Sequence, residues 1–291
     1  MSHSPIKNVA LVGGTHGNEL TGIFLVKKYE QDSHLIRRDS FELLTLLANP
    51  QAIEVGRRYI DTDLNRCFQP QDLQNPKLIS YEQLLAKQIA FTIRQSKIDL
   101  IIDLHSTTSN MGLTMIFHNN HPYLLDLAAY LSGINPLVKV LQYPPNQDHS
   151  YLRSLCELGF AIEVGPVAQG ILNAELFWQT EALISSILNF VELSNQGITP
   201  KVPKTFTQYQ QVKSVDYPRD EQQRIRAMIH PQLQFKDYEI LHPGDPLFLS
   251  FDGEDILYEG ESSMFPIFIN EAAYYEKHIA MSLAIKQQVT L

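Results

Sequence analysis

A histidine and a glutamate, His16 and Glu19, stand three residues apart in the glycine-rich stretch 13–19. An imidazole nitrogen and a carboxylate oxygen are two of the three protein ligands that a catalytic His₂Glu zinc site needs. A separation of three places the two side chains on one side of a helical first turn. The pair alone is a common pattern, and its simpler explanation is a surface or capping histidine with a carboxylate near a helix N-terminus. A metal site therefore requires further residues.

His105 is the natural third ligand, because it ends the apolar run 99–104 and precedes a loop of small polar residues. Asp103 lies two residues earlier, so it points to the same side of the predicted strand and would orient the imidazole. Three protein ligands leave one zinc position for a water, whose pKa the metal lowers towards neutrality. The alternative for His105 is a hydrogen-bonded structural histidine.

Glu163 is the one charged residue in the apolar run 160–164. A carboxylate inside a buried strand is costly unless it is paired or functional. Desolvation would raise its pKa, which suits a general base that takes a proton from the water and returns it to a leaving amine. The alternative is a structural carboxylate that pairs with an arginine.

Four further polar side chains can bind a substrate: Arg58, Asn65, Arg66 and Arg153. Guanidinium groups bind carboxylates in a bidentate manner that lysine does not match, and one of them can instead polarise a carbonyl under attack. Each arginine taken alone is more often a solvated surface residue. Cys67, next to Arg66, is interpreted as a small buried side chain rather than a nucleophile. The chain has no GxSxG motif of a serine hydrolase.

Apolar runs alternate with helical patterns through the first two thirds of the chain. Strands are expected at 8–12, 41–47, 99–104, 113–117, 138–141 and 160–164, and helices at 20–30, 81–94, 122–131 and 174–191. The stretch 57–66 has neither the helical nor the strand period of apolar residues, and Pro70 and Pro76 are expected to continue it as a loop. The alternation predicts an α/β domain with a mainly parallel sheet covered on both faces. His16, His105 and Glu163 then fall at the carboxyl ends of strands, where such sheets bind ligands.

The sequence pattern changes after residues 196–200. From there on, short apolar stretches lie between turn signals such as those at 242–246 and 252–255. We predict a catalytic α/β domain over residues 1–198. We predict a smaller, mostly β domain over residues 199–291.

The composition limits the classes of protein to which the chain can belong. The chain has 291 residues, 44% hydrophobic and 19% charged, which is ordinary for a globular protein. A net charge of −9 disfavours nucleic-acid binding. No apolar run reaches the length of a membrane span, and the first residues have no signal-peptide core. With two cysteines expected to be reduced, the chain is predicted to be cytoplasmic, with a small-molecule substrate and with self-association left open.

Seven blocks of the chain resemble the family of aspartoacylase and succinylglutamate desuccinylase. They are residues 13–22, 58–66, 103–112, 162–166, 215–220, 242–246 and 270–277, in this order. The resemblance therefore covers nearly the whole chain. It implies a zinc-carboxypeptidase-like fold, in which a mixed sheet is covered by helices and followed by a smaller, mostly β C-terminal domain that closes the substrate cleft.

The resemblance implies a zinc-dependent amide hydrolase that converts N-acetyl-L-aspartate to acetate and L-aspartate through a metal-bound water activated by a glutamate. It implies one Zn²⁺ per subunit, held by His16, Glu19 and His105. Glu163 would be the general base and then the general acid, in contact with the substrate, and Arg58 would polarise the scissile carbonyl.

The resemblance also implies the residues that hold the substrate. Asn65 and Arg66 would hold its α-carboxylate, and Tyr274 would reach the pocket from the C-terminal domain. Two positions depart from the family pattern, since Ser106 replaces an asparagine and His149 falls near a tyrosine that contacts the substrate side chain. Arg153 is retained, so a second substrate carboxylate still has a partner.

Two other functions remain as alternatives. One is a deacylase of other N-acyl amino acids, either N-acetyl aromatic amino acids or N-succinylglutamate, and Arg153 and His149 are the residues that would discriminate. The other is a zinc-binding protein without turnover. Glu163 disfavours the second, because a structural zinc site has no use for a base and usually closes all four positions.

Overall fold

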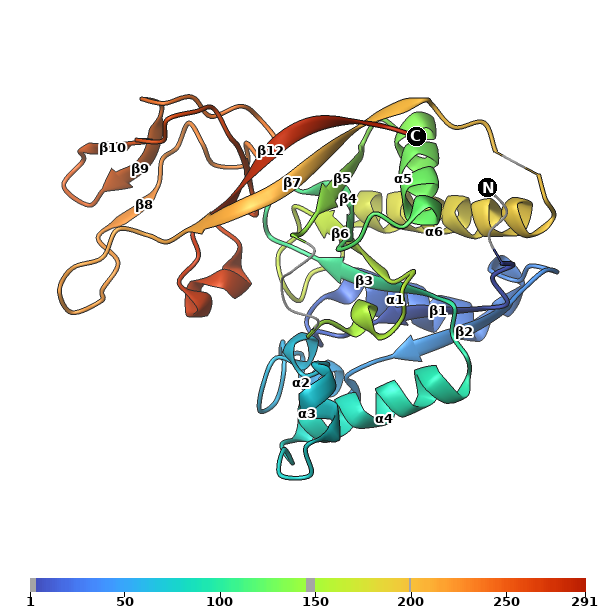
Figure 1. Cartoon of the computed structure of the whole chain (residues 1–291). Helices are drawn as coiled ribbons and strands as arrows, with labels where there is room; N and C mark the ends of the chain where they lie inside the picture. The colour runs from blue at the N-terminus through green and yellow to red at the C-terminus, as the bar shows by residue number, and fades with distance from the viewer. Residues whose placement is uncertain (1–3, 145–149, 199) are drawn as a thin grey trace.

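The computed structural model describes residues 4–144, 150–198 and 200–291 (Figure 1). The strands are β1 (Asn8–Gly13), β2 (Glu42–Leu47), β3 (Leu100–Ser106), β4 (Gly112–Phe117), β5 (Val138–Gln142), β6 (Phe160–Gly165), β7 (Thr205–Val215), β8 (Ala227–Ile229), β9 (Pro246–Ser250), β10 (Asp255–Leu257), β11 (Phe265–Ile267) and β12 (Met281–Thr290). The helices are α1 (Leu20–Gln31), α2 (Pro50–Val55), α3 (Pro70–Gln74), α4 (Tyr81–Gln95), α5 (Pro122–Ile134) and α6 (Ala174–Asn195). Four 3₁₀ segments complete the elements: η1 (Ser33–Leu35), η2 (Leu64–Arg66), η3 (Leu152–Leu155) and η4 (Ala272–Lys277).

One large mixed sheet organises the described residues, with the order β11-β12-β7-β5-β4-β6-β3-β1-β2. Strands β2, β1, β3 and β6 are parallel to one another, whereas β4 is antiparallel to β6. The sheet is therefore mixed, as the family resemblance implies, and less parallel than the alternation of elements predicts. Residues 107–111 are too few for a crossover helix, so β4 runs against β3.

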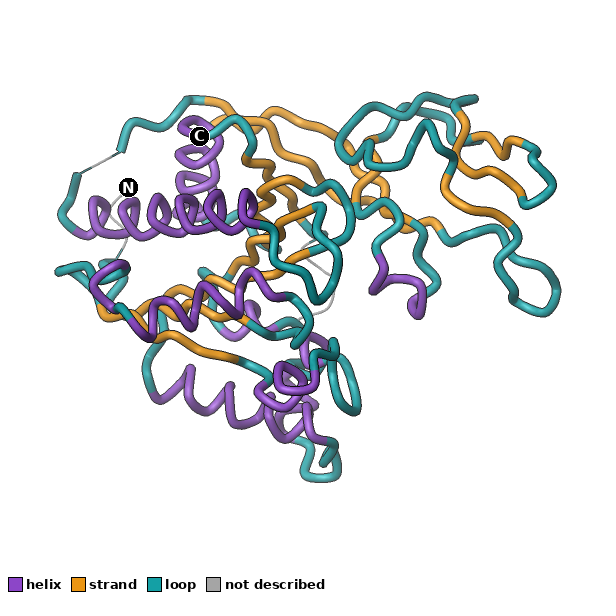
Figure 2. Tube along the Cα trace, turned by 180° about the vertical axis from the view of Figure 1, so that it is seen from behind, coloured by secondary structure: helices purple, strands orange, loops and turns teal. Residues whose placement is uncertain are grey.

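Successive side chains along each strand point to opposite faces of the sheet, so they pack in two separate hydrophobic cores. In β1, Val9 and Leu11 pack with α1, α5 and α6, whereas Ala10 and Val12 pack with α4 on the other face. Figure 2 shows α1 and α6 side by side across the first face, and the two helices are in contact. Both faces of this part of the sheet are thus covered, and the runs in its strands are apolar for that reason.

The segment after residue 198 completes the main sheet and also forms a smaller one. Strand β7 pairs with β5, and β12 and β11 follow it to the sheet edge. A three-stranded sheet of β8, β9 and β10 lies at the far end of the long β7–β12 ribbon (Figure 1). The smaller β part is present as expected, while the division of the chain after residue 198 stays a prediction.

One short helix, α3, occurs where a loop is expected, and another, α2, lies in a stretch for which the sequence analysis made no prediction. The prediction that a loop continues through Pro70 is wrong, because α3 begins at that residue, and α2 begins in the same way at Pro50. Proline is tolerated at the first helical position, where its missing N–H would have no intrahelical partner. Asn49 supports the start of α2 by accepting from the N–H of Ala52 at 3.3 Å.

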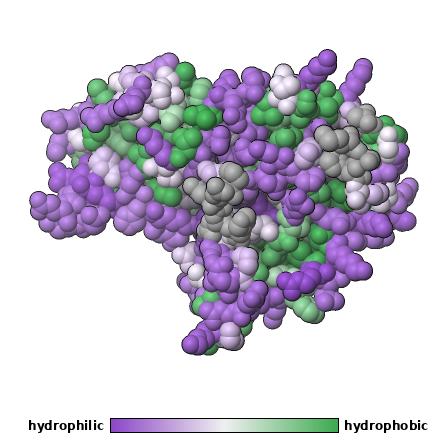
Figure 3. All heavy atoms as spheres, in the orientation of Figure 1, coloured by the Kyte–Doolittle hydropathy of each residue, from purple (hydrophilic) through white to green (hydrophobic). Residues whose placement is uncertain are grey.

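In Figure 3, hydrophilic side chains cover most of the visible face and apolar ones form separate patches. No helix in the described ranges is both long and apolar enough to cross a membrane. Cys67 and Cys156 are both free thiols.

The glycine-rich turn between β1 and α1 is packed against its neighbours. Gly14 has a φ of +70°, which favours glycine. A Cβ on Gly17 would lie 2.1 Å from the carbonyl carbon of Ala52 and 2.3 Å from its oxygen. The turn therefore has its sharp path and its place beside α2 because these positions carry no side chain.

We expect Gly17→Ala to lower the free energy of unfolding by about 3 kcal/mol, because a clash with backbone cannot be relieved by rotating a side chain. Gly197→Ala is the matched control. Its added Cβ meets nothing within 4 Å, so its cost is that of a left-handed backbone, about 1 kcal/mol. Urea unfolding measures both, and a Gly17→Ala protein as stable as the control would contradict the packing described here.

Candidate metal centre and substrate pocket

One pocket at the carboxyl ends of β1, β3 and β6 brings together the side chains that the sequence analysis expects to hold the metal, to act in catalysis and to bind the substrate, apart from His149. Its lining includes His16, Glu19, Arg58, Asn65, Arg66, His105, Arg153, Glu163 and Tyr274. These residues come from segments far apart in the chain, and Tyr274 comes from η4 in the C-terminal part. His149 lies outside the described residues.

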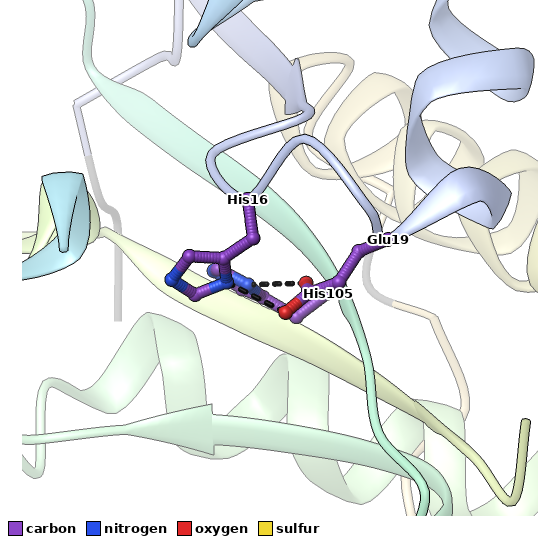
Figure 4. Close-up of side chains that lie close together, drawn as sticks. All are labelled: His16, Glu19 and His105. Atoms are coloured by element: carbon purple, nitrogen blue, oxygen red, sulfur yellow. Dashed lines mark hydrogen bonds and ion pairs between the residues drawn. The ribbon is translucent and has the colours of Figure 1, made fainter. Parts of the chain in front are cut away.

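The carboxylate of Glu19 faces both imidazoles and interacts with each of them (Figure 4). Nδ1 of His16 lies 2.6 Å from Oε1 of Glu19, and Nδ1 of His105 lies 3.0 Å from Oε2. One ligand atom from each of the three residues fits within a span of 4.8 Å. All three side chains are buried. Glu19 immediately precedes α1 but makes no capping hydrogen bond with its side chain, so the simpler capping explanation does not account for it.

An aspartate holds the far nitrogen of each imidazole. Nε2 of His105 lies 2.9 Å from Oδ2 of Asp103, the orienting carboxylate expected from the sequence. Nε2 of His16 lies 2.9 Å from Oδ1 of Asp63, a contact that the sequence analysis did not predict. A carboxylate on the far nitrogen is the usual support of a metal-binding histidine. Two Nδ1 atoms and a carboxylate facing one point, each imidazole backed by a carboxylate, fit a zinc ion.

The electrostatics of the cluster follow from burial and opposite charge. Burial alone would raise the pKa of Glu19, but His16 and His105 hold that pKa well below its usual value. Burial would lower the pKa of His105, but Asp103 and Glu19 raise it well above its usual value. The site thus favours an ionised carboxylate and positive charge around it, which a divalent cation would supply.

Glu163 projects into the pocket beside the cluster. It lies opposite His105 in the β3–β6 register, so both side chains leave the same face of the sheet. Burial raises its pKa to about 8, against the opposing effect of His105. Within the described ranges it forms no ion pair with an arginine, so the structural-carboxylate alternative has no partner. Its role as a base stays a prediction.

Arg58 is bound at the edge of the cluster. Its Nη1 donates to Oε1 of Glu19 at 2.9 Å, and its Nη2 lies 3.6 Å from Oδ2 of Asp63. Its Nε is buried and has no hydrogen-bond partner among the described residues. Asn65 accepts from the N–H of Leu152 at 3.0 Å, and its Nδ2 lies 3.4 Å from Nε2 of His105.

Arg66 and Arg153 lie among aromatic rings. Arg153 is buried, and its Nε donates to Nδ1 of His118 at 3.4 Å. Its Cζ lies 4.1 Å from the ring centroid of Tyr151 and 5.6 Å from that of Tyr143. Arg66 lies over the same Tyr151 ring at 4.6 Å. Neither tyrosine carries a motif signal, and only their proximity in sequence to Arg153 could have pointed to them.

The C-terminal part contacts the cluster through η4. Nζ of Lys277 donates to Oδ2 of Asp63 at 2.8 Å. Glu271 caps η4 and accepts from the backbone N–H of Thr108 at 2.7 Å and from the hydroxyl of Thr107. These two acidic residues thus join the histidine loops to η4, and both lie within blocks that the family resemblance already includes.

A buried glutamate of α4 organises the loop that carries Arg58 and Asp63. Glu82 accepts from three consecutive backbone N–H groups, those of residues 60, 61 and 62, at 2.6, 3.0 and 3.1 Å. It also accepts from Nδ2 of Asn49 at 3.3 Å. In sequence it resembles an exposed first-turn carboxylate of a helix, so nothing identifies it before the fold is known.

Two family models match the chain. The succinylglutamate desuccinylase/aspartoacylase catalytic domain matches residues 5–191, and the barrel-sandwich hybrid domain of the same family matches residues 204–286. A Nostoc protein named "Probable aspartoacylase" is 57% identical, over 98% of each chain. A rat protein named "N-acyl-aromatic-L-amino acid amidohydrolase (carboxylate-forming)" is 39% identical, over 100% of this chain and 94% of its own. The crystal structure of murine aminoacylase 3 superposes with a TM-score of 0.94 at 39% identity, over 99% of this chain and 98% of the other.

We expect Glu82→Gln to lower the free energy of unfolding by about 1–3 kcal/mol, because an amide leaves at least one buried N–H without an acceptor. Since the loop then releases Asp63, zinc affinity should fall by about tenfold. Urea unfolding and competition with a chromogenic chelator measure the two effects. Exposed Glu54→Gln is the matched control, and equal behaviour of the two variants would rule out an organising role for Glu82.

Proposed function

The chain belongs to the succinylglutamate desuccinylase/aspartoacylase family, and we propose that it is a zinc-dependent amide hydrolase that deacetylates N-acetyl-L-aspartate. One observation supports this proposal above the others. Glu163 lies unpaired beside a buried His₂Glu cluster, in the same pocket as Arg66 and Arg153, which have no carboxylate partner among the described residues. A zinc-binding protein without turnover would need neither the base nor the two cations.

In the proposed reaction, the metal ion would activate the water and the protein would transfer the protons. Zn²⁺ held by His16, Glu19 and His105 would act as a Lewis acid and lower the pKa of a bound water. Glu163 would take a proton from the attacking water and deliver it to the leaving amine. Burial raises the pKa of Glu163 towards neutral pH, which suits a group that first accepts and then donates a proton.

Arg58 is suited to the oxygen of the scissile carbonyl. Its guanidinium is oriented by Glu19 and Asp63, and its buried Nε–H is left as a donor. A fixed donor of this kind stabilises the negative charge that develops on the oxygen, without reorganising during the reaction. We assign Arg58 this role, and we assign Tyr274 to the wall of the pocket that η4 contributes.

Two guanidinium groups favour a substrate with two carboxylates. Arg66, with Asn65 beside it, would hold the α-carboxylate, and Arg153 would hold the side-chain carboxylate. Arg153 is buried and Arg66 is partly buried. A guanidinium removed from water without a counter-charge is costly, so an anionic ligand would stabilise both side chains. Bidentate pairing also fixes the direction in which the acyl group points.

N-acetyl aromatic amino acids are a second candidate substrate class. Tyr143, Tyr151, Phe268 and Tyr274 line the same pocket, and aromatic side chains favour offset or edge contacts with such rings. The rat relative is named for this class of substrate. The two candidates differ in their need for Arg153, because an aromatic side chain has no carboxylate to pair with it.

A panel of N-acetyl amino acids assayed with the zinc-loaded protein tests the substrate. We expect N-acetyl-L-aspartate to give the highest kcat/KM. Arg153→Ala should lower that value about 30- to 100-fold, the equivalent of a lost hydrogen bond between charged groups, and should change N-acetyl-L-tyrosine hydrolysis little. Exposed Arg57→Ala is the control. Equal losses on both substrates, or none, would reject the carboxylate assignment of Arg153.

For the base, we expect Glu163→Gln to bind zinc as the wild type does and to lose about 10²- to 10⁴-fold in kcat. Acetate release and metal analysis of the same preparation separate the two effects, with exposed Glu157→Gln as the control. Near-normal turnover would reject the base. Activity that survives complete removal of the metal by a chelator would reject the zinc mechanism.

A further inference from the structure

Arg66 and Arg153 share one aromatic neighbour. The Cζ atoms of the two guanidinium groups lie 4.6 and 4.1 Å from the ring centroid of Tyr151. We propose that the Tyr151 ring sets the separation of the two guanidinium groups and so selects the length of the dicarboxylate that the pocket binds. The identification of that dicarboxylate with the aspartate part of the substrate rests on the proposed function.

The two cations are available to an anion in a way that Arg58 is not. Arg58 is already paired with Glu19 and Asp63. In contrast, Arg66 donates from Nη1 to the backbone oxygen of Asn65 at 2.8 Å, and Arg153 contacts the ring of His118. Neither forms an ion pair with a carboxylate of the described residues. The pocket therefore holds two uncompensated positive charges next to one ring, which matches a ligand with two negative charges.

The ring is a suitable spacer because it attracts both cations. The face of an aromatic ring is electronegative, and its attraction for a guanidinium grows when water is excluded. Two positive charges in a buried site otherwise repel each other, and the repulsion is stronger there than in water. Tyr151 thus attracts both arginine side chains, and the positions available around its ring determine the distance between their guanidinium groups.

The ring itself is held by other aromatic groups. The ring of His118 lies 5.1 Å from that of Tyr151, and the ring of Tyr143 lies 6.2 Å away. A tyrosine has only two rotatable side-chain bonds, so few contacts are needed to fix it. The distance between the two guanidinium groups is then set by a rigid neighbour rather than by two flexible arginine side chains.

A fixed distance between two guanidinium groups favours one carboxylate spacing over the others. Two carbon atoms separate the carboxylates of aspartate and of succinate, whereas three separate those of glutamate and of glutarate. With the proposed substrate, the favoured length is the four-carbon one. Tyr151 is in this sense a specificity-determining residue that acts through two arginines and need not touch the reacting atoms.

Calorimetric binding of malonate, succinate and glutarate tests the proposal without turnover. We expect the wild type and Tyr151→Phe, which keeps the ring, to bind succinate at least tenfold more tightly than the other two. Tyr151→Leu removes the ring and should bind all three within about threefold of one another. Tyr130→Leu is the matched control, because that ring packs on Phe190 at 5.2 Å outside the pocket, and its loss should leave the length preference in place.

Thermal unfolding of each variant shows whether it is folded, and the comparison of lengths within one variant removes any general loss of affinity. A tenfold preference that persists in Tyr151→Leu overturns the proposal, as does its loss in Tyr151→Phe or its absence from the wild type. The proposed function fails separately, if the wild type shows the length preference and Tyr151→Leu loses it but N-acetyl-L-aspartate is not hydrolysed. In that case the spacer role stands and the substrate assignment falls.

Discussion

The carboxylate of Glu19 is the interaction on which the rest of the site depends. Four groups surround its two oxygens: the imidazole of His16 in the same turn, the imidazole of His105 and the backbone N–H of Ser106 at the end of β3, and the guanidinium of Arg58. A buried carboxylate is tolerated only when it is compensated in this way. These groups come from the turn after β1, the end of β3 and the loop after α2, so the charge of one side chain joins three segments of the chain. Asp63 and Asp103 contact the far nitrogens of the two imidazoles, so negative and positive groups alternate outward from Glu19.

Much of the fold and of the metal cluster could be predicted because the signals are local. Apolar runs mark the buried strands, and His105 and Glu163 stand out as polar residues within them. Pro70 misled the prediction, since a proline starts a helix as readily as it ends one. Glu82 and Tyr151 could not be found, because the first binds backbone N–H groups and the second binds arginines that only the folded chain brings near. Their sequence context is that of ordinary helix and loop residues.

The pocket combines compensated and uncompensated cations within an acidic protein. Arg58 and Lys277 are paired with carboxylates and serve the architecture of the cluster. Arg66 and Arg153 rest on aromatic rings, which stabilise a cation without neutralising it. The net charge of −9 therefore says little about the local potential, since a few buried guanidinium groups can dominate a cleft. Because aromatic rings rather than carboxylates contact these two arginines, their positive charge is available to an anionic ligand.

The pairing of β7 with β5 has a consequence for how the two parts of the chain depend on each other. Strand β7 covers the edge of β5. Together with β11 and β12 it contributes Tyr209, Ile267 and Ala284 to an apolar cluster with Ile116 and Leu141. Without the segment after residue 198, β5 would become an open sheet edge beside exposed apolar side chains. Such an edge is a template for pairing with other chains. The C-terminal segment thus covers an edge at which the first part could otherwise pair with other chains, and we expect the two parts to be expressed as a unit.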